Sequence, residues 1–200
     1  PVVAAMRGLA LGGGCELAVY SARRVAHMES YVGLVEVGVG LVPGAGGLTY
    51  IARRAAENMA ASTSKDLLPF LTEGFTAAAM AKVGTSAIES RKLGYLLWSD
   101  VIVPNKDELL HVAIVQAKSM FDSGYRAPVR AMFPVAGRSA IATIKAQVAN
   151  LRDGGFAAAE ALVAAYRHYG SICEPPQRIS FDRAFDLAAH TADQVSISRW

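Results

Sequence analysis

The chain has 200 residues, of which 52% are hydrophobic and 18% are charged, and its formal net charge is +3. This length and composition suit a domain with a substantial core and exclude a disordered chain. The slight positive charge comes without basic runs that alternate with aromatic residues, so we expect no nucleic-acid partner.

The first predicted elements alternate between apolar strands and glycine turns. Residues 1–7 are a short apolar run with β-branched side chains, typical of a buried strand. Residues 15–24 favour a short buried helix, which we expect to run from Gly13 to about Ser21. Residues 24–34 return to strand character, and we expect the strands before residue 34 to pair with one another.

The next segment turns from strand to helix. Residues 38–47 are rich in glycine and proline, which predicts a loop. Residues 48–60 predict a helix with Arg53 and Arg54 on its polar side, and after Gly47 we expect mostly helix.

Helical patterns dominate from residue 61. Residues 62–74 begin with capping residues, but we expect Pro69 to end or kink a helix there. Residues 76–84 and 86–94 predict two short helices, each closed by a glycine, and a single strand follows at residues 100–104.

Longer helices are expected in the last half of the chain. Residues 105–124 have the clearest amphipathic pattern, and residues 137–155 and 156–170 predict two more helices. The pattern beyond residue 170 is weak, and we expect helix and loop there.

Three consecutive glycines lie between the first strand and the first helix. Backbone without Cβ atoms lets a ligand approach the N–H groups that open a helix, where an oxygen that gains negative charge is stabilised. A P-loop is rejected because no lysine follows, and the later "GVGLVPG" has the wrong spacing for a dinucleotide fold. A tight packing turn between strand and helix is the alternative explanation of the triplet.

Two carboxylates accompany the glycines. Glu16 falls in the first turn of the expected helix, where interaction with the helix dipole is its simplest explanation. Glu36 lies among apolar residues, where an unpaired charge would be expensive. The chain path can return Glu36 to the neighbourhood of Glu16, and two carboxylates beside an oxyanion site suit acid/base chemistry.

Three segments of the chain carry a family resemblance. "PVVAAMRGLALGGGCELAVYSARRVA", "VGLVEVGVGLVPGAGG" and "GTSAIESRKLGYLLWSDVIVP" resemble, in order and spacing, the crotonase (enoyl-CoA hydratase/isomerase) superfamily from residue 1 to about 120. The chain is most similar to the hydratase domain of multifunctional β-oxidation proteins that also carry a 3-hydroxyacyl-CoA dehydrogenase domain. Because these 200 residues hold no dinucleotide fingerprint, we expect any dehydrogenase part to lie outside them.

The resemblance implies an α/β fold. We expect part of a crotonase-like ββα superhelix over residues 1–120, lacking its N-terminal portion, followed by a mostly helical C-terminal region over residues 121–200. Residues from about 156 onward no longer resemble the family.

The resemblance also implies site residues. Gly13 matches the family's oxyanion-hole donor, and Glu16 and Glu36 match the two catalytic glutamates of hydratases. Those glutamates hold one water, activate it for attack on Cβ of a trans-2-enoyl-CoA, and supply a proton to Cα. We expect further substrate contacts from Gly12, Gly14, Leu41, Pro43 and Gly44.

The sequence departs from the family in two places. Val35 stands where the family often has proline. The family's second oxyanion donor and much of its CoA-binding wall come from a segment upstream of Pro1, so we expect a truncated chain that is nearly inactive alone.

Three functions remain open at this point. Enoyl-CoA hydratase is the first, 3,2-enoyl-CoA isomerase the second, and a catalytically silent structural fragment the third. Glu16 favours hydratase, since isomerases commonly lack a carboxylate at that position. We expect no cofactor beyond the coenzyme A of the substrate, and either oligomers or a covalently linked dehydrogenase domain.

The remaining chemistry-bearing residues favour structural roles. Cys15 and Cys173 lie far apart without a CxxC pair, and the four histidines have no HxxxH spacing, so we expect no metal, a reducing compartment and a cytoplasmic protein. Apolar runs are too short for a membrane span. For Arg23, Arg24, Arg53 and Arg54, solvated or salt-bridged roles are favoured over contacts with CoA phosphates.

Overall fold

The computed structural model describes residues 1–39, 41–128, 132–152 and 178–179. The chain forms two compact units. The first combines Pro1–Leu34 with Lys82–Val129, and the second combines Val35–Ala81 with the described part of Arg130–Trp200. The predicted division at residue 120 remains a prediction.

A parallel sheet forms the centre of the first unit. Its strands are β1 (Val3–Leu11), β2 (Arg23–Gly33) and β3 (Val101–Val103), in the order β1-β2-β3. Helix α1 (Gly13–Val19) connects β1 to β2, as a parallel pair requires a crossover. The predictions that the early strands pair and that a helix begins at Gly13 are therefore confirmed.

The pairing of β1 with β2 contains one irregularity. The register shifts between Met6 and Gly8, and Gly8 has a φ of +66° that favours glycine. At the same place, the Ser30 hydroxyl donates to the Met6 carbonyl oxygen at 3.2 Å. The bond gives the Met6 carbonyl oxygen a hydrogen-bond partner where the strand pairing is irregular.

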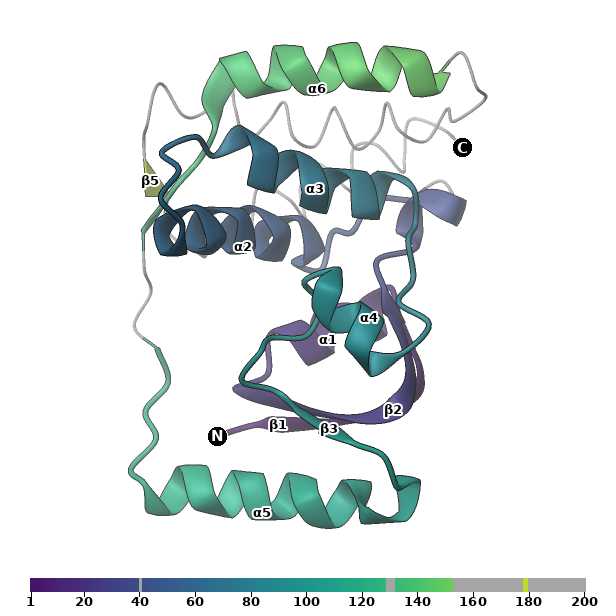
Figure 1. Cartoon of the computed structure of the whole chain (residues 1–200), viewed down its shortest axis with the longest axis vertical. Helices are drawn as coiled ribbons and strands as arrows, with labels where there is room; N and C mark the ends of the chain where they lie inside the picture. Colours follow the sequence, from purple (N-terminus) through teal and green to yellow (C-terminus); the bar gives the residue numbers. More distant parts are fainter. Residues whose placement is uncertain (40, 129–131, 153–177, 180–200) are drawn as a thin grey trace. The chain divides into compact units, whose positions relative to one another are not determined.

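Helices cover both faces of this sheet (Figure 1). The 3₁₀ turn η2 (Lys106–Glu108) leads into α5 (Leu109–Asp122), whose Leu109 and Ala113 pack with Val25 and Val103. Helices α1 and α4 (Ala87–Lys92) lie on the opposite face. The spacing of four between Leu109 and Ala113 places both side chains on one helical face, as the amphipathic pattern predicted.

The first helix is less buried than expected. Cys15, Glu16, Ala18 and Val19 are buried, whereas Leu17 is 79% exposed. The helix ends at Val19, and Leu17, which lies between the buried pairs Cys15–Glu16 and Ala18–Val19, falls on the opposite side of the helix. The expectation of a short buried helix to about Ser21 was therefore wrong at Leu17 and at the C-terminal end.

The second unit is mostly helical. It contains the 3₁₀ helix η1 (Glu36–Val39), α2 (Gly47–Ala61), α3 (Leu68–Ala79) and α6 (Gly137–Arg152). A short antiparallel pair, β4 (Phe133–Pro134) with β5 (Arg178–Ile179), completes its described elements. Helices α2 and α3 pack side by side (Figure 1). The predicted helix at residues 156–170 and the weakly patterned tail, apart from β5, lie outside the described residues.

Pro69 does not break a helix. It lies in the first turn of α3, where proline is tolerated because the first N–H groups of a helix have no partner within it. The segments at 62–74 and 76–84, expected to be separate, therefore contribute to one helix, Leu68–Ala79.

The predicted α/β class is confirmed. Within the described residues, no helix is both long and apolar enough to cross a membrane.

Candidate active site

The first glycine of the triplet has a structural role. Gly12 caps the start of α1 with φ 53° and ψ −124°, a conformation that side chains rarely adopt. Its N–H donates to the Gly33 carbonyl oxygen at 2.9 Å, and its own carbonyl oxygen accepts from the Glu16 N–H at 3.0 Å. The start of α1 is thus tied to the end of β2.

Gly13 and Gly14 have no such role. Both are exposed, neither has a positive φ, and a Cβ built on either meets nothing within 4 Å among the described residues. The packing-turn explanation therefore holds for Gly12 and not for its two neighbours. As residues of the first helical turn, both have N–H groups without a partner inside the helix. What remains as a reason for glycine is access for another molecule to these N–H groups.

Glu16 lies in the same turn and is only 4% exposed. The backbone of Glu16 therefore shares the first turn of α1 with Gly13 and Gly14. A carboxylate on a solvent-facing cap would serve the helix dipole alone. Burial of this one shows that the first turn is part of a packed environment.

Glu36 lies near the start of the second unit. It is the first residue of η1, both of its carboxylate oxygens are shielded from solvent, and its carbonyl oxygen accepts from the Leu41 N–H at 2.9 Å. The chain that leads to it is fixed in the first unit, because the Leu34 N–H donates to the Tyr95 hydroxyl at 3.4 Å. Burying carboxylate oxygens is costly, so this position is a specified feature of the fold.

Glu16 and Glu36 belong to different units. The bond from Gly12 to Gly33 ends three residues before Glu36 in the chain. The pairing of the two carboxylates on one water stays a prediction from the sequence.

The other predicted substrate contacts lie between η1 and α2. Leu41 is exposed, Gly44 is half-buried and Pro43 is fully buried. Leu41 is therefore available to a ligand, whereas Pro43 would act by shaping the loop. Their roles in binding remain predictions.

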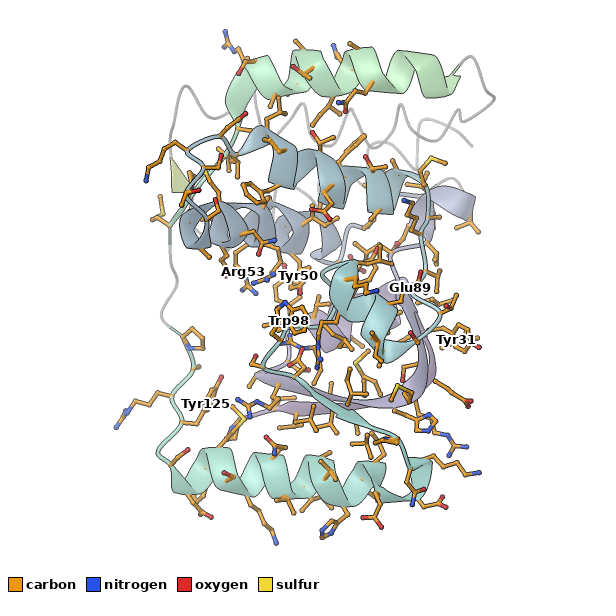
Figure 2. All side chains as sticks on the ribbon, viewed as in Figure 1. Tyr31, Tyr50, Arg53, Glu89, Trp98 and Tyr125 are labelled. Atoms are coloured by element: carbon orange, nitrogen blue, oxygen red, sulfur yellow. The ribbon has the colours of Figure 1, made fainter. Side chains whose placement is uncertain are left out.

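The arginines have the structural roles that the sequence favoured. Arg53 pairs with Glu57 at 3.3 Å and lies 5.7 Å from the centre of the Tyr50 ring (Figure 2), and Arg54 also pairs with Glu57. Arg24 forms a buried ion pair with Asp100. The salt-bridged interpretation is confirmed for these three residues.

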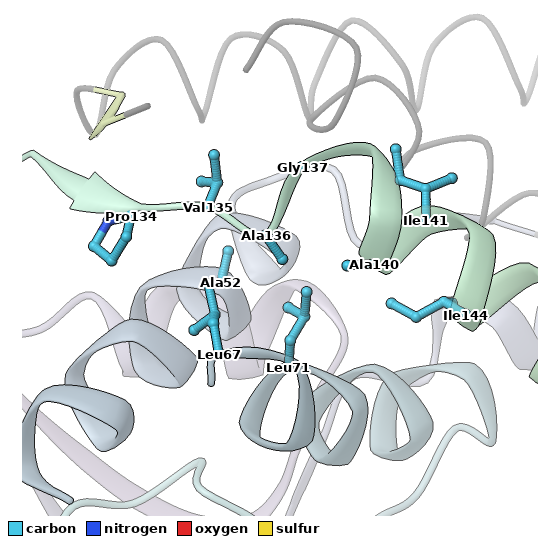
Figure 3. A pocket seen from close by; sticks show the side chains of 10 residues that line it. All are labelled: Ala52, Leu67, Leu71, Pro134, Val135, Ala136, Gly137, Ala140, Ile141 and Ile144. Carbon is cyan, nitrogen blue, oxygen red and sulfur yellow. The ribbon is translucent and has the colours of Figure 1, made fainter. Parts of the chain in front are cut away.

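Two cavities in the described part of the second unit are lined by residues other than the predicted site residues. One of about 30 Å³ is lined by apolar side chains of α2, α3, α6 and the segment before α6 (Figure 3). A neighbouring pocket of about 510 Å³ adds Lys65 and Asp66 at its wall. The described part of the chain holds no group of three or more His, Cys, Asp or Glu side chains arranged for a metal ion.

Comparison with known families identifies the N-terminal segment. Residues 1–90 match the family model described as enoyl-CoA hydratase/isomerase. The matched region contains Gly13, Glu16 and Glu36. The resemblance found in the sequence motifs is confirmed over these residues.

Relatives extend the similarity further along the chain. A probable 3-hydroxyacyl-CoA dehydrogenase of Bacillus subtilis is 39% identical over 160 residues, which are 78% of this chain and 19% of that protein. The human peroxisomal bifunctional enzyme is 55% identical over 53 residues, or 26% of this chain and 7% of its own. A crotonyl-CoA hydratase of Syntrophomonas wolfei is 47% identical over 60 residues, or 30% of this chain and 23% of its own. The chain thus spans less than a quarter of each of these relatives.

Solved structures support the fold. The enoyl-CoA hydratase of Mycobacterium tuberculosis H37Rv aligns with a TM-score of 0.51 and 20% identity, over 99% of this chain and 64% of that one. At this identity the likeness concerns the fold, which is the predicted crotonase-like one.

Proposed function

Because residues 1–90 carry the sequence of the enoyl-CoA hydratase/isomerase family, we propose that the protein containing this chain is an enoyl-CoA hydratase. It adds water syn across the double bond of a trans-2-enoyl-CoA and yields a 3-hydroxyacyl-CoA, a step of fatty-acid β-oxidation. The observation that carries the proposal is the first turn of α1. There, two glycines that neither packing nor backbone strain requires adjoin a buried glutamate.

The proposed mechanism assigns one task to each group. Glu16 and Glu36 hold a water between them; one of them, ionised, removes a proton from the water as its oxygen attacks Cβ, and the other, as the protonated carboxylic acid, gives its proton to Cα. The electron pair of the double bond moves toward the thioester, whose oxygen gains enolate-like charge. The Gly13 N–H donates to that oxygen, where a preorganised donor stabilises charge as it develops.

The setting of this activity is also proposed. Relatives named as a 3-hydroxyacyl-CoA dehydrogenase and a bifunctional enzyme support a protein that links the hydratase to a dehydrogenase. Addition of water transfers no hydride, so the hydratase step uses no cofactor besides the coenzyme A of its substrate. We place the protein in the cytoplasm, with self-association or the linked domain as its partner.

The test uses the full-length natural protein and a short 2-enoyl-CoA, with loss of the conjugated thioester absorbance as the signal. Glu16→Gln and Glu36→Gln should each lower kcat by about a hundred- to ten-thousand-fold, because glutamine keeps the shape but cannot exchange the proton. Glu29→Gln is the matched control, since Glu29 is an exposed residue of β2. Its kcat should stay that of the wild type.

Two results would change the assignment. If Glu16→Gln were silent while Glu36→Gln abolished turnover, the 3,2-enoyl-CoA isomerase would replace the hydratase, since that reaction needs only the second glutamate. If the wild-type protein neither hydrates a 2-enoyl-CoA nor isomerises a 3-enoyl-CoA, the catalytically silent structural role would replace both enzyme assignments.

A further inference from the structure

A buried ion pair lies behind the proposed site. Arg24, at the start of β2, is 3% exposed, and Asp100, immediately before β3, is 5% exposed. The Arg24 Nε donates to Asp100 Oδ2 at 2.6 Å, and the Arg24 backbone N–H donates to Oδ1 at 3.1 Å. Oδ2 also accepts from the Leu97 N–H at 2.6 Å. The carboxylate is therefore anchored to the turn before β3 on one side and to β2 on the other.

The guanidinium has a second set of contacts. Its Nη1 donates to the Val19 carbonyl oxygen at 2.8 Å and reaches the Ser21 carbonyl oxygen at 3.4 Å. Val19 is the last residue of α1. The final carbonyls of a helix lack partners within it and carry partial negative charge, so a cation there satisfies both needs.

Helix α1 depends on such anchors. With seven residues, it is far shorter than a helix that is stable by itself in water. Other elements of the first unit bond to both ends of α1, through the Gly12 N–H to the Gly33 oxygen at the start and the Arg24 guanidinium at the finish, and Ser21 adds local bonds from its hydroxyl to the Leu17 oxygen and from its N–H to the Ala18 oxygen. Glu16 lies one turn before Val19, so a shift of the C-terminal end would move its carboxylate.

We propose that the Arg24–Asp100 pair positions α1, and through it the Glu16 carboxylate and the Gly13 amide, for the hydration reaction. This inference rests on the proposed function. A buried ion pair is seldom a gain in stability over well-packed apolar side chains, so its value here lies in geometry. The forked, planar guanidinium reaches a carboxylate and helix carbonyls at once, which a lysine ammonium cannot reproduce.

The chain offers a matched control for this proposal. Arg91 of α4 donates through Nη2 to the Asp100 carbonyl oxygen at 2.8 Å and through Nε to the Leu97 carbonyl oxygen at 3.2 Å. It therefore binds the same turn before β3 with two hydrogen bonds, yet none of its described bonds goes to α1. Both Arg24→Lys and Arg91→Lys remove guanidinium bonds to the turn before β3, and only Arg24→Lys also removes bonds to the end of α1.

The experiment combines kinetics with hydrogen exchange on the full-length protein. Arg24→Lys should lower kcat for a short 2-enoyl-CoA by about ten- to a hundred-fold and change KM less than about three-fold. Displacing a catalytic group by about 1 Å lowers the rate by a factor of that order. Amide exchange in a peptide covering residues 13–19 should become at least about ten-fold faster, because that helix loses its C-terminal anchor. Arg91→Lys should leave both quantities near the wild-type values.

The two measurements separate the two proposals. Unchanged exchange over residues 13–19 in Arg24→Lys, or an equal rise in Arg91→Lys, would overturn the positioning role whatever the activity. Wild-type protein without hydratase activity would overturn the proposed function, and exchange would still show whether Arg24 holds α1. If Arg24→Lys fails to fold, Asp100→Asn provides the same exchange and kcat comparison, because it keeps the size of the side chain while removing its charge.

Discussion

At the residue scale, glycines of this chain are present for different physical reasons. Gly12 is required by its positive φ, whereas Gly84 is required by crowding. A Cβ on Gly84 would lie 2.4 Å from Ser90 Oγ and 2.7 Å from the Ser90 backbone nitrogen. Gly13 shows neither constraint, so a substitution there should separate function from stability.

We predict opposite effects of alanine at positions 13 and 84. Gly13→Ala should leave stability unchanged or raise it by up to about 1 kcal/mol, since alanine is the better helix former, while hydratase activity falls as the methyl group intrudes on the substrate oxygen. Gly84→Ala should lower stability by about 1–3 kcal/mol, the usual cost of overpacking. Denaturant unfolding and kcat measure the two effects, and a destabilised Gly13→Ala would return the glycine triplet to a packing role.

At the element scale, α4 is held by its own N-terminal residues. Ser86 caps the helix by accepting from the Glu89 N–H at 3.1 Å, and the Glu89 carboxylate accepts from the Thr85 N–H at 2.8 Å and from the Thr85 hydroxyl. This resembles a capping box, except that the Glu89 carboxylate accepts from Thr85, the residue before the N-cap Ser86. Two hydrogen bonds from Thr85 lower the pKa of Glu89 below its ordinary value of 4.5, and the bond from the hydroxyl has a larger effect than the bond from the backbone N–H.

The lowered pKa predicts a pH dependence for this helix. A carboxyl whose folded-state pKa is depressed contributes stability that is present above the unfolded value of 4.5 and is lost as pH falls through the folded pKa. Thr85→Val removes the hydroxyl bond, so the Glu89 pKa should rise toward 4.5 and part of the stability should disappear near neutral pH. NMR titration of Glu89 and unfolding midpoints between about pH 3 and 6 measure both, with Glu73→Gln, at an exposed position of α3, as the control. An unmoved Glu89 titration in Thr85→Val would contradict this account.

The elements themselves were largely predictable from local patterns. β-branched runs predicted β1 and β2, and the amphipathic repeat predicted α5. Each pattern depends on which side chains of the segment face the core, and neighbouring residues are enough to show it. Pro69 was misjudged because its effect depends on its position within a helix, and the N-cap residue of α3, Leu67, makes no side-chain cap bond that would mark the start. The exposure of Leu17 was missed because the extent of α1 decides which residues face the sheet.

At the scale of the whole molecule, long-range pairs set the limit of prediction. Glu16 and Glu36 could be singled out because each contrasts with its local surroundings. The Arg24–Asp100 pair spans 76 positions, and neither residue differs in sequence from an ordinary surface charge. Only folding brings β2, β3 and the end of α1 together, so their shared anchor is visible in the structure alone.

The proposed mechanism requires groups from both compact units to act on one water, which a double-mutant cycle can measure. Glu16 lies in the first unit and Glu36 in the second. If both carboxylates act on the same water, losing one removes most of what the other contributes, so their effects on kcat are strongly non-additive. In the full-length protein, Glu16→Gln combined with Glu36→Gln should therefore lower kcat little further than the more damaging single change. Independent sites would instead multiply their losses. A fully multiplicative double variant that remains folded would show that the two glutamates do not share a water.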